Sequence, residues 1–417
     1  MSFTFRRMAV PGRPLAVAAA LAVLAAAGCG SSSSPTASAP SGGGTAYTIG
    51  LLTDASGPGA SGNATSVQGV KAGIAWAAAQ GVHINLVVGD TETSPTAALS
   101  AAQTLVRQDH VLAVDAISAL TFAASAFLAA QKIPVFGSAE DGPEWNSSRN
   151  MFSITGPDEP TLVPPEFGQL MKMEGGTNLA SIGYGVSPSS ADAAQVDAKS
   201  ATEAGLKAGY VNTNFPFGST NVGPAVIAMK NAGIDSFTAA TDSNTSLAFI
   251  TGLKNDGVKL KFSILDTGYG GDLLSAGPGA EQAAQGVDFS LPYEPVEMHT
   301  PQTEQFQKYL ASAGVKGEPT FAEYLGYASV LYFVQALKAA GATATQASLT
   351  SAMANIHSFS AGGLTSAGYP IVNNGTGIPA GTTECLYITQ FSGTAFHLVA
   401  GADPICGKVL AMRAAGR

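Results

Sequence analysis

The feature that most constrains the fold is a regular alternation of apolar strands and helical segments that begins at Ala46. In the first half, short runs rich in β-branched residues alternate with segments whose apolar residues recur at helical spacing. The predicted strands are Tyr47–Thr53, His83–Gly89, Val111–Ile117 and Ile133–Phe136, and the predicted helices are Thr65–Ala79, Pro95–Gln108 and Thr121–Gln131. Short connections between such elements predict a parallel sheet covered by helices on both faces.

The same order restarts in the second half. The predicted helices are Glu166–Met173, Ala191–Ala204, Val222–Asn231 and Ser246–Asn255, and the strands that follow them are Leu179–Ile182, Tyr210–Phe215, Asp235–Ala240 and Lys261–Leu265. The dipeptides Gly156-Pro157 and Leu291-Pro292 indicate boundaries between the halves. Helices at Thr303–Ala313 and Phe321–Ala340 return to one half, and Ser392-Gly-Thr394 predicts a hairpin turn between Glu384–Phe391 and Ala395–Val399.

The first 45 residues have a different character. Arg6, Arg7 and Arg13 precede an uncharged run that ends at Gly28, and Cys29 is followed by a tract of Ser, Gly and Pro. This order is typical of an export signal. The segment from Leu24 to Cys29 resembles a bacterial lipobox, in which Cys29 would carry the lipid, although Ala26 stands where lipoboxes usually have Leu. The alternative is an ordinary secretory signal in which Cys29 has no special role.

Charge limits the possible partners. Lys and Arg number 20 against 29 Asp and Glu, a net charge of −9, and removal of Arg6, Arg7 and Arg13 with the signal makes the net charge of the remainder −12. Such an acidic chain does not favour nucleic acid or an anionic membrane surface as a partner.

The remaining cysteines and the histidines give little sign of metal binding. Cys385 and Cys406 lie close together in sequence, and disulfides persist in exported proteins, so we expect these two to pair. The five histidines are scattered singly, and there is no C-x-x-C motif. We therefore expect no metal site and no cofactor.

One motif allows an enzymatic interpretation. Gly57-Pro-Gly-Ala-Ser-Gly62 matches G-x-G-x-x-G between a strand and a helix, and Asp90 ends the next strand, as in dinucleotide-binding folds. Asp90 is more distant than the usual spacing, and the alternative is a glycine-rich turn that lets a small ligand approach the backbone. The sequence contains no G-x-S-x-G, H-E-x-x-H or P-loop motif, and we expect no enzymatic activity.

The order of motifs resembles the branched-chain-amino-acid type (type I) of periplasmic substrate-binding proteins. The resemblance rests on Ile49-Gly-Leu51, Ser56-Gly-Pro58, Gly69–Ile74, Ile117–Thr121 and Ile133–Phe136. It extends to about Ala340. It implies two doubly wound lobes joined by a hinge around a central ligand cleft, and lipid-tethered relatives serve as receptors of ABC importers.

The resemblance also implies ligand-binding residues in the first lobe. Ser118 matches a serine that binds the ligand's carboxylate, and it precedes a helix whose N-terminus favours an anion; a plain helix cap is the alternative. Ala139 matches a residue that offers its backbone carbonyl. Asp141 matches a hydroxyl residue that contacts the amino acid, or is a turn residue. Gly57 belongs to the glycine-rich turn.

In the second lobe, Asp266 matches an acidic residue that pairs with the ligand's ammonium group. It follows the strand Lys261–Leu265, and acids at strand ends in open α/β sheets face the ligand crevice; a capping role is the alternative. Tyr269 covers the ligand or is a loop aromatic. Where amino-acid binders have an aromatic residue after the Gly-Pro turn, this chain has Ser61-Gly62, so leucine itself is a doubtful ligand.

We therefore expect the following organisation: a signal at 1–28, a flexible tether at 29–45, a first lobe from 46–157 and about 290–360, and a second lobe from 158–289 and about 361–412. The expected function is a monomeric receptor, exported and held on the outer face of the cell membrane by lipid on Cys29. It would pass a small polar molecule, an amino acid or amide-like compound, to an ABC permease. The alternatives are a ligand sensor without transport and a dinucleotide-dependent enzyme.

Overall fold

The computed structural model describes residues 46–140, 142–155, 162–341, 343–365 and 383–411, together with the backbone of Tyr369 and Pro370. The signal, Cys29, the tether, Asp141 and Gly156-Pro157 lie outside the described residues, so the predictions made for them stay predictions. None of the helices in the described ranges has both the length and the apolar character that a membrane span requires.

The first sheet has five parallel strands in the order β2-β1-β3-β4-β5. Their bounds are Ala46–Thr53 (β1), His83–Asp90 (β2), Ala113–Ile117 (β3), Val135–Gly137 (β4) and Met151–Ser153 (β5). The register pairs Thr53 of β1 with Asp90 of β2 and with Ile117 of β3. The carboxyl ends of these three strands therefore reach one edge of the sheet together, and the reversal of strand order falls between β1 and β3.

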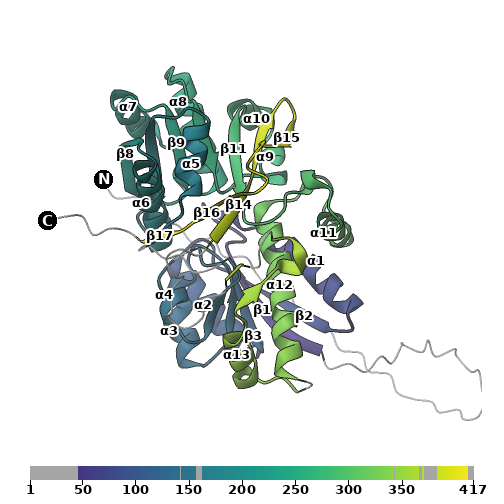
Figure 1. Ribbon diagram of the computed structural model, residues 1–417. Helices are drawn as coiled ribbons and strands as arrows, with labels where there is room; N and C mark the ends of the chain where they lie inside the picture. Colours follow the sequence, from purple (N-terminus) through teal and green to yellow (C-terminus); the bar gives the residue numbers. More distant parts are fainter. Residues whose placement is uncertain are drawn as a thin grey trace, which may run out of the picture. The chain divides into compact units, whose positions relative to one another are not determined.

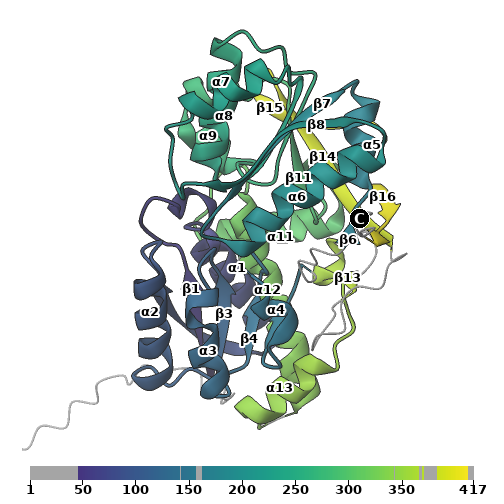
Figure 2. The same cartoon turned by 90° about the vertical axis from the view of Figure 1, so that its left-hand side faces the viewer.

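Helices cover both faces of this sheet (Figures 1 and 2). The helices of the first half are α1 (Ser66–Ala79), α2 (Pro95–Arg107), α3 (Phe122–Ala130) and α4 (Glu144–Ser147), after the short 3-10 turn Ala60–Gly62. Helices α2 and α3 pack side by side on one face, while α1 and α12 pack on the other. Helix α12 (Phe321–Ala340) is buried along most of its length, which explains its nearly continuous apolar sequence.

The second sheet has the order β15-β14-β11-β10-β9-β7-β8. Its parallel strands are β7 (Asn178–Tyr184), β8 (Lys207–Phe215), β9 (Ser236–Ala240), β10 (Phe262–Leu265) and β11 (Val287–Leu291). Strand β14 (Thr383–Ser392) runs antiparallel to β11 and forms the predicted hairpin with β15 (Ala395–Leu398). The α/β class and the two parallel-sheet lobes are thus confirmed.

The helices of the second lobe again form two layers. Their bounds are Glu166–Met173 (α5), Pro188–Glu203 (α6), Gly223–Asn231 (α7), Ser243–Asn255 (α8), Gly271–Ala276 (α9) and Pro278–Ala283 (α10). Helices α5 and α6 pack on one face, and α7 and α8 on the other. The chain then returns to the first lobe through α11 (Pro301–Ser312), α12 and α13 (Gln346–Ala354), since α1 packs against α11 and α12.

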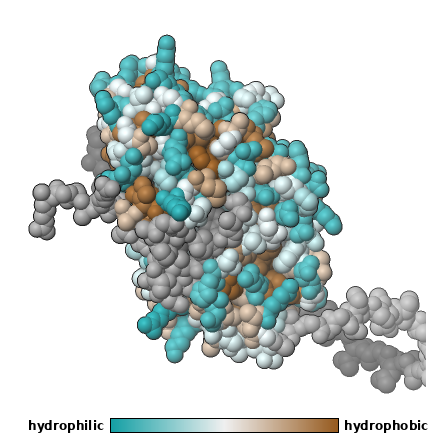
Figure 3. Space-filling model, in the orientation of Figure 1, coloured by the Kyte–Doolittle hydropathy of each residue, from teal (hydrophilic) through white to brown (hydrophobic). Residues whose placement is uncertain are grey.

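The remaining elements are short. They are the β-pairs β6 (Leu162–Val163) with β17 (Leu410–Ala411) and β12 (Ser358–Phe359) with β13 (Tyr369–Pro370), the strand β16 (Ile405–Lys408) and the 3-10 turns Val296–Met298 and Ala361–Gly363. Large exposed hydrophobic side chains lie on separate elements, such as Val88 on β2, Met173 on α5 and Ile227 on α7. On the face shown in Figure 3, hydrophobic surface accordingly forms small patches between polar side chains.

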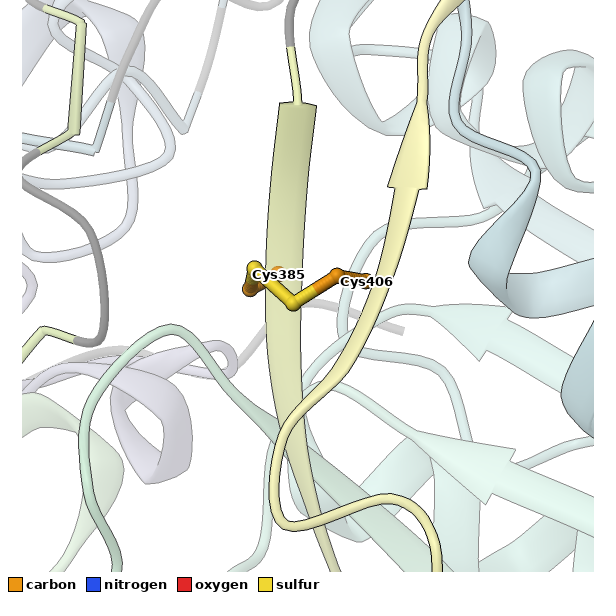
Figure 4. Close-up of a disulfide and its surroundings, with 2 residues drawn as sticks. All are labelled: Cys385 and Cys406. Carbon is orange, nitrogen blue, oxygen red and sulfur yellow. A yellow bond between two sulfur atoms is a disulfide. The ribbon is translucent and has the colours of Figure 1, made fainter.

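Cys385 of β14 and Cys406 of β16 form the expected disulfide, with an S–S distance of 2.06 Å. The two residues are direct partners in the antiparallel register, so the bond joins neighbouring strands (Figure 4). It anchors the last strands of the chain to the sheet of the second lobe.

Removal of this disulfide should lower the free energy of unfolding. The bond closes a loop with a sequence separation of 21, and constraining such a loop in the unfolded chain stabilises the fold by roughly 3 kcal/mol. The double variant Cys385→Ser, Cys406→Ser should show this loss in guanidinium unfolding, and thiol titration of the unfolded, unreduced protein should find neither cysteine free. Two titratable thiols would contradict the pairing.

Candidate ligand-binding cleft

A cavity of about 220 Å³ lies at the carboxyl ends of the strands of both sheets. The first lobe contributes residues that follow β1, β3 and β4, and the second lobe contributes residues that follow β7, β8, β9 and β10. The lining residues are Asp54, Gly59, Gly62, Asn63, Ala119, Glu140, Tyr184, Ser187, Ser189, Ser190, Ala193, Phe217, Ala240, Thr241, Asp242, Asp266, Thr267 and Phe321. Open α/β sheets bind ligands at this edge, where the strand order reverses.

Asp54 organises the wall of the first lobe. It follows β1 directly and is fully buried. Its carboxylate accepts hydrogen bonds from Ser118 Oγ at 2.6 Å, from the backbone N–H of Ala119 at 2.9 Å and from Asn63 Nδ2 at 3.0 Å, and also from the hydroxyl of Thr91. Both oxygens are therefore held by donors from the loops after β1, β2 and β3.

Ser118 was predicted to bind a ligand's carboxylate. Its side chain is fully buried and donates to Asp54, and Ser118 is absent from the cavity lining. The neighbouring N–H of Ala119 also donates to Asp54. The two donors that precede α3 are thus occupied by a carboxylate of the protein itself, and the ligand role of Ser118 stays a prediction.

Glu140 lies beyond β4 beside Asp54. Asn63 Nδ2 donates to its Oε2 at 2.9 Å, whereas its buried Oε1 meets no hydrogen-bond donor in the described part of the chain. Burial, reinforced by the negative charge of Asp54, raises the pKa of Glu140 to about 7. Ala139, its half-buried neighbour, does not line the cavity, so its predicted carbonyl contact is untested.

Asp242 is the main hydrogen-bond acceptor in the wall that the second lobe contributes. It caps the N-terminus of α8, where its side chain accepts from the backbone N–H groups of Asn244 and Thr245 at 3.0 and 3.2 Å. The hydroxyl of Thr245 donates to it at 2.8 Å, and so does the hydroxyl of Tyr184 at the end of β7. Burial and the charge of Asp242 raise the pKa of Tyr184, which stays a hydrogen-bond donor.

Asp266 lines the cavity, in agreement with the position predicted for it after β10. Ser290 of β11 donates a short hydrogen bond to its carboxylate. Desolvation by the surrounding protein raises the pKa of Asp266, but the residue is exposed, so access to solvent offsets part of this rise. Asp266 also lines a second, smaller cavity of about 80 Å³ that contains Glu166.

Three aromatic rings form an apolar part of the cavity. Tyr184 and Phe217 pack with their centroids 4.7 Å apart at an angle of 57°, and Phe321 at the start of α12 lines the cavity from the first lobe. Tyr269 was predicted to cover the ligand, but it is absent from the lining. It is 1% exposed, donates to Glu297 Oε2 at 2.7 Å and packs on Phe396.

The two lobes touch beside the cavity. Ser61 Oγ donates to Asp242 Oδ1 at 2.9 Å, and Ser243 Oγ donates to the carbonyl of Ser61 at 3.2 Å. A Cβ atom on Gly59 would lie 2.7 Å from Cε1 of Phe217, so a larger residue there would displace the ring. The small residues of the glycine-rich turn therefore allow the two lobes to pack closely together.

Gly57 itself does not line the cavity. Its φ is +95°, a conformation that favours glycine, and the turn packs on Glu92 and Thr93. Asp90 accepts hydrogen bonds from the N–H and hydroxyl of Ser56 at 3.1 and 2.6 Å. These hydrogen bonds hold the turn against the end of β2. They also use the carboxylate of Asp90, which in a dinucleotide-binding fold would accept hydrogen bonds from the ribose.

The raised pKa values of several buried carboxyl groups predict that the free energy of unfolding falls as the pH rises. Burial raises the pKa of five carboxyl groups to values between about 6 and about 8: those of Glu140, Glu166, Asp288, Glu323 and Glu384. The folded state therefore binds more protons than the unfolded chain between roughly pH 4 and pH 8, and stability falls with rising pH in that window.

Thermal unfolding measured from pH 5 to pH 8 should show a falling midpoint, and Glu140→Gln and Glu384→Gln should each flatten the curve. Each pKa unit corresponds to about 1.4 kcal/mol, so the total loss should be at least a few kcal/mol. A midpoint that rises toward pH 8 would contradict the raised pKa values of these carboxyl groups in the folded state.

Solved structures with the same fold were found by comparison. A solute-binding protein of an ABC transporter from R. palustris, in complex with 4-hydroxybenzoate, is 17% identical, with a TM-score of 0.67 over 83% of this chain and 93% of that one. A leucine-binding protein from Thermotoga maritima is 17% identical, with a TM-score of 0.68 over 85% and 98%.

A branched-chain amino acid transporter substrate-binding protein from Streptococcus pneumoniae, in complex with isoleucine, is also 17% identical, with a TM-score of 0.69 over 87% of this chain and 99% of that one. No curated protein matches the sequence. The sequence model of the periplasmic binding proteins, however, matches residues 46–395. The chain therefore belongs to the periplasmic binding protein family.

Proposed function

We propose that the protein is an extracytoplasmic, lipid-anchored solute receptor that delivers a small polar molecule to an ABC permease. The observation that carries this proposal is the cavity enclosed by strand ends of both lobes. Its walls combine apolar rings with a few polar groups, as ligand pockets do. At about 220 Å³ it is smaller than the roughly 300–1,000 Å³ of pockets for drug-sized molecules, which favours a small ligand.

The family and the cleft support a proposal for the class of the ligand. The relatives of the same fold include proteins solved with isoleucine, with benzoate and with 4-hydroxybenzoate. For this chain we propose a small solute in the range of amino acids, amides and related polar compounds. Binding and release by movement of the two lobes is the usual mechanism of such clefts, and it needs neither a cofactor nor a catalytic group.

A thermal-shift screen tests the receptor function. The purified protein should gain stability with at least one member of a panel of amino acids, amides, urea, small carboxylic acids and small amines, because a ligand that binds only the folded state stabilises it by RT ln(1 + [L]/Kd). A deletion strain should lose uptake of the same compound. Binding without loss of uptake would favour a sensor, and the absence of any ligand across the panel would contradict a receptor.

The lipid anchor is tested separately. Cys29→Ser should move the protein from the membrane fraction to a soluble fraction or to the medium, because the acylated thiol is the only proposed membrane attachment. Ser38→Ala in the tether serves as a matched control and should leave the distribution unchanged. An equal distribution of the Cys29 variant and the parent protein would contradict acylation.

A further inference from the structure

The cavity is acidic, and no basic side chain from the described part of the chain lines it. Four carboxyl groups line it, those of Asp54, Glu140, Asp242 and Asp266, and none of the Lys, Arg or His residues in the described ranges is among its lining residues. A charge enclosed by protein is costly unless a partner of opposite sign is present. The cleft is therefore suited to a positively charged occupant.

Two sites where a carboxylate ligand could bind are already occupied by carboxylates of the protein. At the N-terminus of α3, Asp54 accepts from Ser118 Oγ and from the N–H of Ala119. At the N-terminus of α8, Asp242 accepts from the N–H groups of Asn244 and Thr245. A helix N-terminus attracts anions, and these two are thus neutralised by the protein's own side chains.

The N-terminus of α6 also borders the cavity, through Ser187, Ser189 and Ser190. A helix end contributes about half a positive charge, and Ser187 already caps the N–H of Ser190. Half a charge does not balance the carboxylates opposite. Neither Glu140 nor Asp266 caps a helix in the described part of the chain, and Oε1 of Glu140 is buried there without a hydrogen-bond donor.

We propose that the cleft recognises a small organic cation, an amine or ammonium compound without a carboxylate, held between Glu140 and Asp266 and against the rings of Tyr184 and Phe217. The inference rests on the receptor function proposed above. Aromatic faces attract ammonium groups, and Tyr184, Phe217 and Phe321 supply such surfaces to the cavity. Carboxylates on both lobes then allow one cation to draw the lobes together.

An organic cation fits better than a metal ion. The oxygens of Asp54 and Asp242 already accept several hydrogen bonds from the protein. Within the described part of the chain, no group of three or more His, Cys, Asp or Glu is arranged to hold a metal ion. An ammonium group needs fewer ligands and also uses the apolar rings.

Two sets of probes that share a hydrocarbon part and differ in their charged groups test the proposal. The full mature protein, freed of bound molecules by unfolding and refolding with the disulfide intact, is mixed with benzylamine or benzoate, and with 3-methylbutylamine, leucine or 4-methylpentanoate. CaCl₂ is a further probe. The two amines should raise the thermal midpoint and bind at least about tenfold more tightly than the matched zwitterion and carboxylates.

Substitutions in the cleft identify the groups responsible. Glu140→Gln and Asp266→Asn should each weaken amine binding at least about tenfold, since each removes one opposing charge and keeps the size of the side chain. Glu304→Gln on α11 is the matched control, because Glu304 is exposed and absent from the cavity lining. It should leave amine affinity unchanged.

The pH dependence provides an independent readout. Amine affinity should rise from pH 6 to pH 8 as Glu140, whose pKa is about 7, loses its proton. Among the described residues, the ionisable groups that act on Glu140 electrostatically are Asp54 and Tyr293. Because burial raises the pKa of Tyr293 further above its ordinary value, it stays neutral in this range, and Glu140→Gln should abolish the pH effect.

The outcomes separate the two proposals. Binding of leucine, benzoate or 4-methylpentanoate as tightly as of the matched amine, or binding of Ca²⁺ alone, would overturn the cation assignment and leave the receptor in place. Binding of only amides or urea in the wider screen would do the same. A lack of any shift with both amines also overturns the cation assignment, and a lack of any ligand across the wider panel overturns the receptor as well.

Discussion

The arrangement of the loops around the cleft depends on the hydrogen bonds to one buried carboxylate. Asp54 is fully buried directly after strand β1, where an unpaired charge would be strongly destabilising. Its hydrogen bonds come from Asn63, Thr91, Ser118 and Ala119, which lie on the loops after β1, β2 and β3. Satisfying this single group therefore fixes three loops together and determines which donors remain for a ligand.

The fold was largely predictable because its signals are local. Strands such as β1 and β10 are short apolar runs, and Pro95 and the capping residues mark helix starts. Helix α13 was not predicted, since its sequence is mostly small and polar residues and only Leu349 and Met353 are buried. Its position is set by packing on α12, which the sequence alone does not reveal.

The cleft was only partly predictable. The position of Asp266 at the cavity was predictable because an acid directly follows a strand, and the same signal marks Asp54 after β1. The ligand role of Asp266 stays a prediction. What the sequence could not indicate is that Asp54 would occupy the donors of Ser118 and Ala119, because that pairing joins residues 64 and 65 positions apart. Likewise, Tyr269 was predicted in the cleft, and the structure instead surrounds it with Tyr324 and Phe396.

The contact between Gly59 and Phe217 also indicates where a fluorescent probe would report separation of the two lobes. The two tryptophans, Trp76 in α1 and Trp145 in α4, both lie in the first lobe and do not line the cavity. Neither indole ring would therefore contact a bound ligand, and tryptophan fluorescence would not report binding directly. Phe217 packs across the interface of the lobes and beside Tyr184, so a fluorophore introduced there would experience a different solvent environment whenever the lobes separate.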